Sequence, residues 1–396
     1  MYKKKMTKEP FVLGAIGSGT IVGAFGNCQR DGYLSLIETN VREAFMSQGL
    51  KFEVRTAVFG SFCGASPKSV TSCVPSLLGN AIDLLHYSFP HSDDDAETRF
   101  RLARVSGGSV HVIEPSCGAS GVEQKGKGKN ARLLNGFSQK GSDVLCLEEA
   151  LQTVFGDKYK GQSWGLVGDG MHKTTRGSEN GVVWRNWAPG PLGHQFIADA
   201  TSMLLFKALR LMASLSGAPK DMAVDGLAPV PLSPACFIAH DPHHGTDDIA
   251  VSNANKWRRL PGESAGDDEI PLEDRENPNC EHPDACGFYE ARGSSAGALV
   301  FKIPSSESLP GRKVFVCCCC NAELCVEEQF RDYVEFTWSQ AVTVVSRAEA
   351  TNQNSSIVGK ECLLIAKDMP FANELTISIK TGSTNVPVRI SSVIAG

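Results

Sequence analysis

The sequence predicts an α/β fold in its first half, with a parallel β-sheet covered by helices on both faces, and a β-sandwich domain at its C-terminus. Short apolar runs typical of buried strands alternate with helical patterns through the first half of the chain. Proline and glycine then become frequent, and residues 264–281 are acidic and turn-rich. Short strands separated by turns follow, a spacing typical of a sandwich. We therefore expect an α/β domain at residues 10–215, a linker or long loop region at 216–290 and a β-sandwich domain at 291–396.

The elements of the α/β domain are predicted from the spacing of apolar residues. A continuous apolar run at residues 11–16 predicts the first strand, and a glycine-rich turn follows at residues 17–23. The helix predicted at residues 33–48 has four apolar residues on one face, namely Leu34, Ile37, Val41 and Phe45. Further strands are predicted at 51–59, 82–89, 109–113 and 163–167, further helices at 69–80 and 146–155, and a long amphipathic helix from near Gly193.

The C-terminal domain is predicted from short apolar stretches that alternate with turns. Such stretches are typical of antiparallel strands that bury one face. The predicted strands lie at residues 298–303, 314–319, 333–336, 341–345, 362–366, 375–380 and 386–393.

Composition excludes several classes of protein. The chain has 396 residues, of which 42% are hydrophobic, so it is long enough for two or three globular domains. The formal net charge is -5 and no long basic run occurs, which argues against a nucleic-acid-binding protein. No stretch approaches the ~20 apolar residues of a membrane-spanning helix, so we expect no membrane span in this chain.

Cysteine usage points to an oxidising compartment. The chain contains 14 cysteines, which favours a secreted protein or one of the secretory-pathway lumen whose leader is absent from this chain. The alternative is a cytoplasmic protein with free thiols. Cys280 and Cys286, like Cys320 and Cys325, are not in paired C-x-x-C spacing, so we expect no structural zinc. The polar stretch at residues 240–248 lies in a loop and is interpreted as solvated surface, so no metal site is expected.

A candidate catalytic pair follows the last predicted strand of the α/β domain. Asp169 and His172 lie three residues apart on a loop that contains two glycines, directly after residues 163–167. The carboxyl ends of parallel strands are where α/β sheets build their sites. An aspartate can fix the tautomer of a histidine that acts as a general base. This pair still needs a nucleophile from elsewhere in the chain.

Three stretches of the α/β domain carry a family resemblance. The first is the turn at residues 17–23, which leads to Gly26-Asn27-Cys28, and the second is residues 51–60, followed by Cys63 and Cys73. The third is Asp169 to His172, followed by the sequence PGPLGH at 189–194, which opens a helix. Together they resemble the SGNH (GDSL-type) hydrolases, closest to a divergent branch of algae and related protists in which a β-rich domain follows.

The resemblance implies a flavodoxin-like parallel sheet and ester hydrolysis without a metal or organic cofactor. It implies that Ser18 attacks the acyl carbon, with Thr20 as the alternative nucleophile. His172 would shuttle the proton and Asp169 would orient His172. The residues implied to hold the oxyanion are Gly19, Gly60 and Ser92. The implied substrate is an O-acyl (acetyl) ester of a carbohydrate or another acylated small molecule.

The chain departs from the family pattern in two places, and both leave alternatives open. The family serine precedes a glycine by four residues, and that position here is Gly19, with Ser18 one residue early and Thr20 one late. The family histidine usually stands directly before a proline close to the last helix. That position here is Ala188, with Arg185 three residues earlier. The second hypothesis is therefore a catalytically inactive SGNH-fold protein that binds a glycan or a protein.

Overall fold

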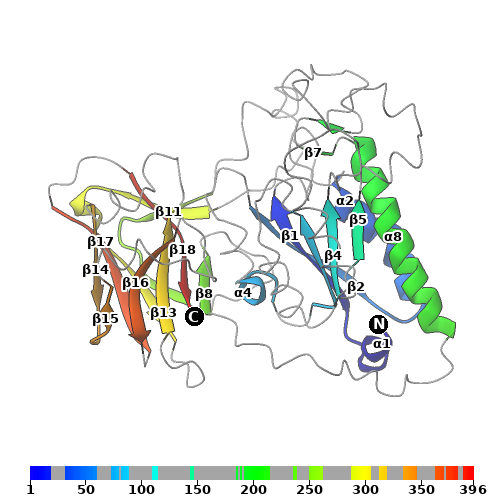
Figure 1. The fold of residues 1–396 in the computed structure, drawn as a ribbon, viewed down its shortest axis with the longest axis horizontal. Coiled ribbons are helices and arrows are strands. Elements are labelled where there is room, and N and C mark those ends of the chain that lie inside the picture. The colour runs from blue at the N-terminus through cyan, green and yellow to red at the C-terminus, as the bar shows by residue number, and fades with distance from the viewer. Residues whose placement is uncertain are drawn as a thin grey trace, which may run out of the picture.

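The chain folds into two lobes that lie side by side in the computed structural model (Figure 1). The N-terminal lobe combines strands and helices, and the C-terminal lobe consists of strands. The structure describes residues 1–18, 32–59, 73–79, 82–88, 109–114, 143–146, 184–185, 188–189, 191–214, 235–238, 249–261, 287–304, 312–318, 333–345, 362–369, 372–381 and 387–396.

A five-stranded parallel sheet forms the centre of the N-terminal lobe. Its strands are β1 (Phe11–Ser18), β2 (Phe52–Phe59), β3 (Leu84–Ser88), β4 (Ser109–Glu114) and β5 (Asp143–Cys146). They are arranged in the order β2-β1-β3-β4-β5, and every neighbouring pair is parallel. This is the order of flavodoxin-like sheets, whose ligands bind at the carboxyl ends of the strands where the order reverses. The predicted parallel sheet is thus confirmed.

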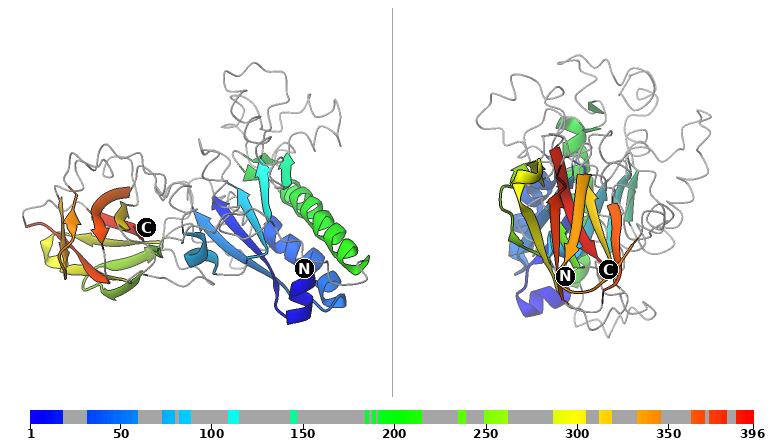
Figure 2. Two further views of the ribbon diagram at one scale, coloured as in Figure 1. Left: turned by 60° about the horizontal axis from the view of Figure 1, so that its bottom comes forward. Right: turned by 90° about the vertical axis from the view of Figure 1, so that its left-hand side faces the viewer.

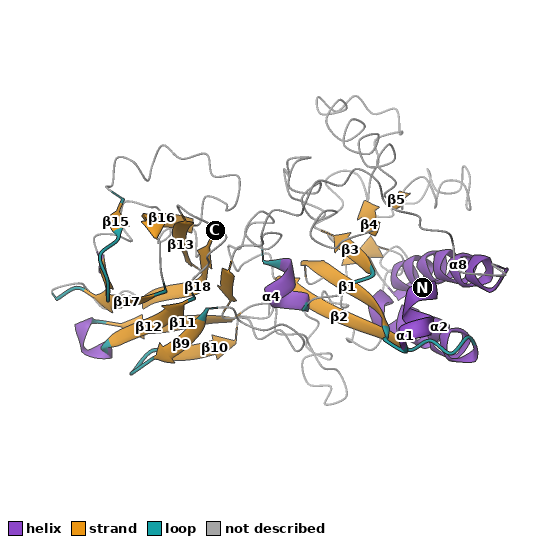
Figure 3. Cartoon of the chain, turned by 90° about the horizontal axis from the view of Figure 1, so that it is seen from below, coloured by secondary structure: helices purple, strands orange, loops and turns teal. Residues whose placement is uncertain are grey.

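Helices cover both faces of this sheet, as predicted. The helices described are α1 (Tyr2–Thr7), α2 (Tyr33–Ser47), α4 (Val74–Leu78) and α8 (Pro191–Ser214). α2 and α8 run alongside each other on one face (Figure 2), whereas α4 lies on the opposite side of β1 and β2 (Figure 3). Successive side chains of a strand point to opposite faces, so Leu13 packs on the α2 side while Gly14 faces Leu78 of α4.

The core beneath α2 and α8 matches the apolar faces read from the sequence. The four residues predicted on the face of α2 are all buried, and they pack with Leu13 and Ala15 of β1. α8 contributes Ile197, Leu205 and Leu209 to the same cluster. Burying one apolar stripe of each helix against the sheet is what stabilises amphipathic helices in such folds.

Some elements differ from the prediction. A strand, β5, ends at Cys146, where the sequence favours the start of a helix. The predicted helix at 69–80 is a short helix, α4, within the described residues. A small hairpin of β6 (Trp184–Arg185) and β7 (Ala188–Pro189) precedes α8 and was not predicted. The strand expected at 163–167 lies outside the described residues.

The C-terminal lobe consists of two antiparallel sheets. One has the order β10-β11-β18-β13-β16-β15, with β8 paired to β18, and the other has the order β14-β17-β12-β9. The strands are β8 (Ala235–Ile238), β9 (Ala250–Asn253), β10 (Arg258–Pro261), β11 (Gly287–Arg292), β12 (Ala298–Ile303), β13 (Arg312–Cys318), β14 (Val334–Trp338), β15 (Thr343–Val344), β16 (Cys362–Met369), β17 (Asn373–Ile379) and β18 (Pro387–Ala395), with a short 3₁₀ helix at Ser294–Ala296.

The two sheets share one apolar core. Along β12, Leu299, Phe301 and Ile303 alternate inward and are buried. The ring of Phe301 lies 5.0 Å from that of Phe237, a residue of β8 in the other sheet. Three strands, β8, β9 and β10, and the first four residues of β11 come from the predicted linker at 216–290 and pair into these sheets. The domain boundaries themselves stay a prediction.

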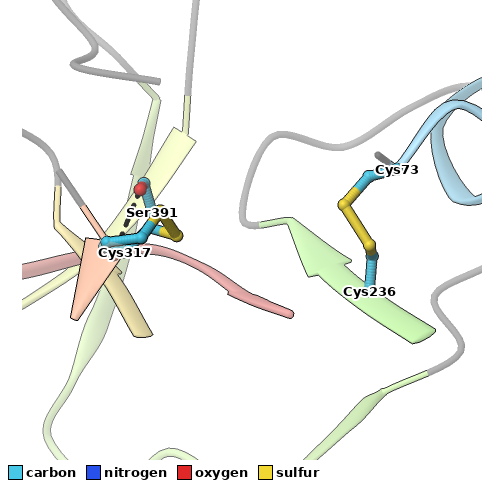
Figure 4. The surroundings of a disulfide bond; sticks show 5 residues. Cys73, Cys236, Cys317 and Ser391 are labelled. Carbon is cyan, nitrogen blue, oxygen red and sulfur yellow. Dashed lines mark hydrogen bonds between the residues drawn. A yellow bond between two sulfur atoms is a disulfide. The ribbon is translucent and has the colours of Figure 1, made fainter. Parts of the chain in front are cut away.

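Two disulfides are present among the described residues. Cys317 and Cys362 face each other across β13 and β16. Cys73, the residue before α4, is bonded to Cys236 of β8 and so joins the two lobes (Figure 4). Within the described ranges, the structure contains no helix that is both long and apolar enough to cross a membrane.

Candidate active site

Ser18, the predicted nucleophile, is the last residue of β1. Its register partner on β2 is Phe59, the last residue of that strand, and the preceding Gly17 pairs with Ser88, the last residue of β3. Ser18 therefore ends the middle strand of three at the carboxyl edge of the sheet, between the two neighbours where the order reverses. Gly19 and the alternative nucleophile Thr20 lie outside the described residues.

The other predicted site residues follow strands of this sheet in the sequence. Gly60 follows the last residue of β2 directly, and Ser92 follows the end of β3 by four residues. Asp169 and His172 fall between β5 and α8. These four residues lie outside the described part of the chain, so their assignment to a site remains a prediction.

The hairpin before α8 holds the two positions of the alternative family register. Arg185 of β6 and Ala188 of β7 are register partners, so the two residues lie directly opposite each other. A histidine and an aspartate at these positions would be close neighbours, because directly opposed residues of antiparallel strands have Cβ atoms about 4.5–5.5 Å apart. Alanine has no group that exchanges a proton, so this pair cannot perform general acid–base chemistry.

A buried polar cluster lies just inside the carboxyl edge, on the face covered by α2 and α8. It consists of Tyr33, the first residue of α2, His86, the middle residue of β3, and His194 in the first turn of α8. All three are almost completely buried. We call these three side chains the edge cluster. The sequence analysis did not connect the three residues.

Tyr33 links the other two residues of the edge cluster. Its hydroxyl lies 2.6 Å from Nε2 of His86, with which it shares a hydrogen bond. Its backbone N–H donates to Nδ1 of His194 over 3.2 Å. The tyrosine ring meets the ring of His86 edge-on at 5.3 Å and stacks on that of His194 at 5.6 Å.

The bond between Tyr33 and His194 caps α2. The first N–H groups of a helix have no partner within the helix, and Gly32 at the N-cap has no side chain to supply one. His194 supplies the acceptor from the neighbouring helix. Since Nδ1 accepts this bond, neutral His194 carries its ring proton on Nε2.

The arrangement suits stabilisation of negative charge at the carboxyl edge. α2 and α8 both begin beside it, and a helix N-terminus carries a partial positive charge. The side chains of the edge cluster are buried and therefore are not exposed at this edge. No group of three or more metal-ligating side chains occurs among the described residues.

No protein-family model matches the sequence, and no curated protein matches it. Solved structures with a similar course of the chain include a two-domain esterase (CEX) active on acetylated mannans, at 14% identity and a TM-score of 0.47 over 99% of this chain and 94% of that one. The same esterase co-crystallised with mannopentaose has 14% identity and a TM-score of 0.47 over 99% of this chain and 92% of that one. LAE5, an alpha/beta hydrolase enzyme from the metagenome of Lake Arreo, Spain, has 13% identity and a TM-score of 0.33 over 52% of this chain and 97% of that one. Identities of 13–14% and TM-scores below 0.5 do not assign a function to this chain.

Proposed function

We propose that the protein is an esterase-like hydrolase that removes O-acyl, most simply acetyl, groups from a carbohydrate through a Ser-His-Asp type site. The observation that carries the proposal is the place of Ser18, at the carboxyl end of the strand where the sheet order reverses. In the sequence, Gly60 directly follows Phe59, the last residue of the neighbouring strand β2. The proposal therefore takes the nucleophile from the end of β1 and an oxyanion-binding N–H from the residue after β2.

In the proposed reaction, Ser18 Oγ attacks the ester carbonyl carbon and His172 accepts the hydroxyl proton. Asp169 holds His172 in the required tautomer. N–H groups at Gly19 and Gly60, with Ser92, bind the oxyanion of the tetrahedral intermediate. His172 then gives the proton to the leaving sugar oxygen. Water attacks the acyl-enzyme in the second half of the reaction, releases the acid and restores the serine.

The first test is labelling with a fluorophosphonate probe, followed by mass spectrometry of the modified peptide. Wild type, Ser18→Ala, Thr20→Ala and His172→Ala are compared as folded proteins. An adduct on Ser18 that is lost in His172→Ala supports the proposal. An adduct on Thr20 would identify Thr20, in place of Ser18, as the nucleophile. If folded wild-type protein forms no adduct, the hydrolase proposal fails.

The rival function is an inactive SGNH-like protein that binds a glycan or a protein. One observation favours it: Ala188 stands opposite Arg185 in the hairpin before α8, where the second family register places the catalytic pair. In this inactive protein, the carboxyl edge of the sheet would keep the fold of a hydrolase site but lack the side chains that transfer the proton. Binding of unmodified and acetylated oligosaccharides, measured by calorimetry without any release of acetate, would support the rival.

The compartment and the partners belong to the same proposal. Two disulfides among the described residues fit folding in an oxidising compartment, secreted or in the lumen of the secretory pathway. The alternative, a cytoplasmic location, predicts free thiols at these four positions. The proposed reaction needs no metal or organic cofactor, and its substrate is an acylated carbohydrate or another acylated small molecule.

A further inference from the structure

The edge cluster connects three elements that meet at the carboxyl edge. His86 is two residues from the end of β3, a distance of about 6.6 Å along the strand. Tyr33 begins α2 and His194 belongs to the first turn of α8. Two hydrogen bonds, of 2.6 and 3.2 Å, and two ring contacts hold these starting points together.

The two helix starts follow, in the sequence, the two segments that matter most for the proposed reaction. After Ser18 the next described element is α2. After Asp169 and His172 the next described element is the hairpin of β6 and β7, which contacts α8 and leads directly into it. Tyr33 and His194 therefore fix, relative to each other, the helices that follow the nucleophile and the proton-transfer residues.

We propose that Tyr33 and His194 are positioning residues of the hydrolase, which fix the start of α2 to the start of α8 so that the nucleophile and the catalytic histidine stay within hydrogen-bond reach. This inference rests on the proposed function. Both residues are buried, at 1% and 0% exposure, so they act through backbone segments and not on the substrate. A displacement of about 1 Å between reacting groups lowers rates by about a hundredfold.

The chemistry of the edge cluster supports positioning over simple packing. Most of the core between α2, α8 and the sheet is apolar, as Ile37, Val41 and Phe45 illustrate, and the buried polar residues Thr201 and Ser202 lie further along α8. Burying polar groups is costly unless they are hydrogen-bonded, and directional bonds define one arrangement where apolar contacts permit several. The edge cluster joins three separate elements through directional hydrogen bonds, which fits a role in alignment.

The test compares kcat and KM for p-nitrophenyl acetate, at a temperature where circular dichroism shows each variant folded. Tyr33→Phe keeps the ring and removes the bond to His86. His194→Leu removes the acceptor for the Tyr33 N–H, whereas His194→Asn keeps an acceptor close to the position of Nδ1. We expect Tyr33→Phe and His194→Leu to lower kcat by about ten- to a hundredfold with unchanged KM, and His194→Asn to retain most of kcat.

Two control variants change the same helix pair away from the edge. Asn40→Ala removes the bonds from α2 to Asp199 and Ser202 of α8, and Phe45→Leu loosens the core at the other end of α2. Both are expected to keep the wild-type kcat while folded. Wild-type kcat in Tyr33→Phe and His194→Leu, or an equal loss in Phe45→Leu, would overturn the positioning role alone. An inactive wild-type protein would overturn this role and the hydrolase proposal together.

Discussion

Cys73 and Cys236 form a disulfide across 163 residues of sequence, and this bond joins the residue before α4 to β8 in the other lobe. Both cysteines are fully buried. The bond therefore fixes the end of the connection between β2 and α4 against the sandwich. Gly60, a proposed oxyanion donor, lies at the start of the same connection.

Removing this disulfide is expected to destabilise the protein. Loop-closure entropy for a separation of this length gives about 5 kcal/mol, and measured effects of native disulfides are about 2–5 kcal/mol. The double variant Cys73→Ser/Cys236→Ser should unfold at a lower temperature than wild type. The bond between Cys317 and Cys362 closes a shorter loop, of 45 residues, and its removal should cost about 1 kcal/mol less. Free thiols at Cys73 and Cys236 in peptide mapping of the oxidised protein would contradict the pairing.

Gly14 of β1 is predicted to be intolerant of larger residues. A Cβ at this position would lie 3.0 Å from Ile82 Cγ2 and 3.1 Å from Leu78 Cδ1. Gly14→Val should therefore lower the free energy of unfolding by about 1–3 kcal/mol through overpacking against α4. Ile82→Ala in the same chain should relieve part of this loss, so the two changes should couple by at least about 0.5 kcal/mol in a urea-unfolding cycle.

Gly49 provides the contrast for Gly14. It has φ +73° with open space around its Cα, so Gly49→Ala is strained through the backbone and not through a clash. The loss in free energy of unfolding caused by Gly49→Ala should be additive with the loss caused by Ile82→Ala. Strong coupling there, or additivity at Gly14, would mean that the close approach of Ile82 to β1 is wrong.

The ion pair between Arg389 and Glu290 is expected to stabilise the sandwich modestly. The two residues are register partners on β18 and β11, and Nε of Arg389 lies 2.8 Å from Oε2 of Glu290. Both are largely covered, so Arg389→Ala should cost about 1 kcal/mol in urea unfolding. Lys302 and Glu374 are the control, because their side chains are 62% and 46% exposed and their charges lie 4.0 Å apart. Lys302→Ala should change stability by less than about 0.5 kcal/mol, and an equal effect of both variants would contradict the assigned difference in burial.

The sequence predicted best those elements whose own residues carry a long, regular pattern. The buried face of α2 and the limits of β12 agree with the apolar spacing, because both elements bury one side against a core. β5 was missed because it has only four residues, too few to show a period. β9 was hidden in a turn-rich stretch, since its partner β12 lies nearly fifty residues further along the chain.

The candidate site could be predicted only in part, for a similar reason. A glycine-rich turn after an apolar run is local, so the position of Ser18 at a strand end followed from the sequence. The edge cluster is not local: Tyr33 lies 53 residues from His86 and 161 residues from His194. Single-sequence patterns carry no signal for such contacts, because helix packing alone brings these residues together.

The choice between the two family registers gives the sharpest prediction for function. If Asp169 and His172 serve Ser18, His172→Ala should lower the rate of fluorophosphonate labelling by at least about a thousandfold. Arg185→Asp/Ala188→His rebuilds the other register on the hairpin, where the two side chains would lie opposite each other. Added to His172→Ala, this double change should not restore labelling, because the proposed nucleophile is aligned with the residue at 172. Labelling that appears only with the rebuilt hairpin would place the ancestral pair at 185 and 188, and would favour the inactive binding protein as the natural state of this chain.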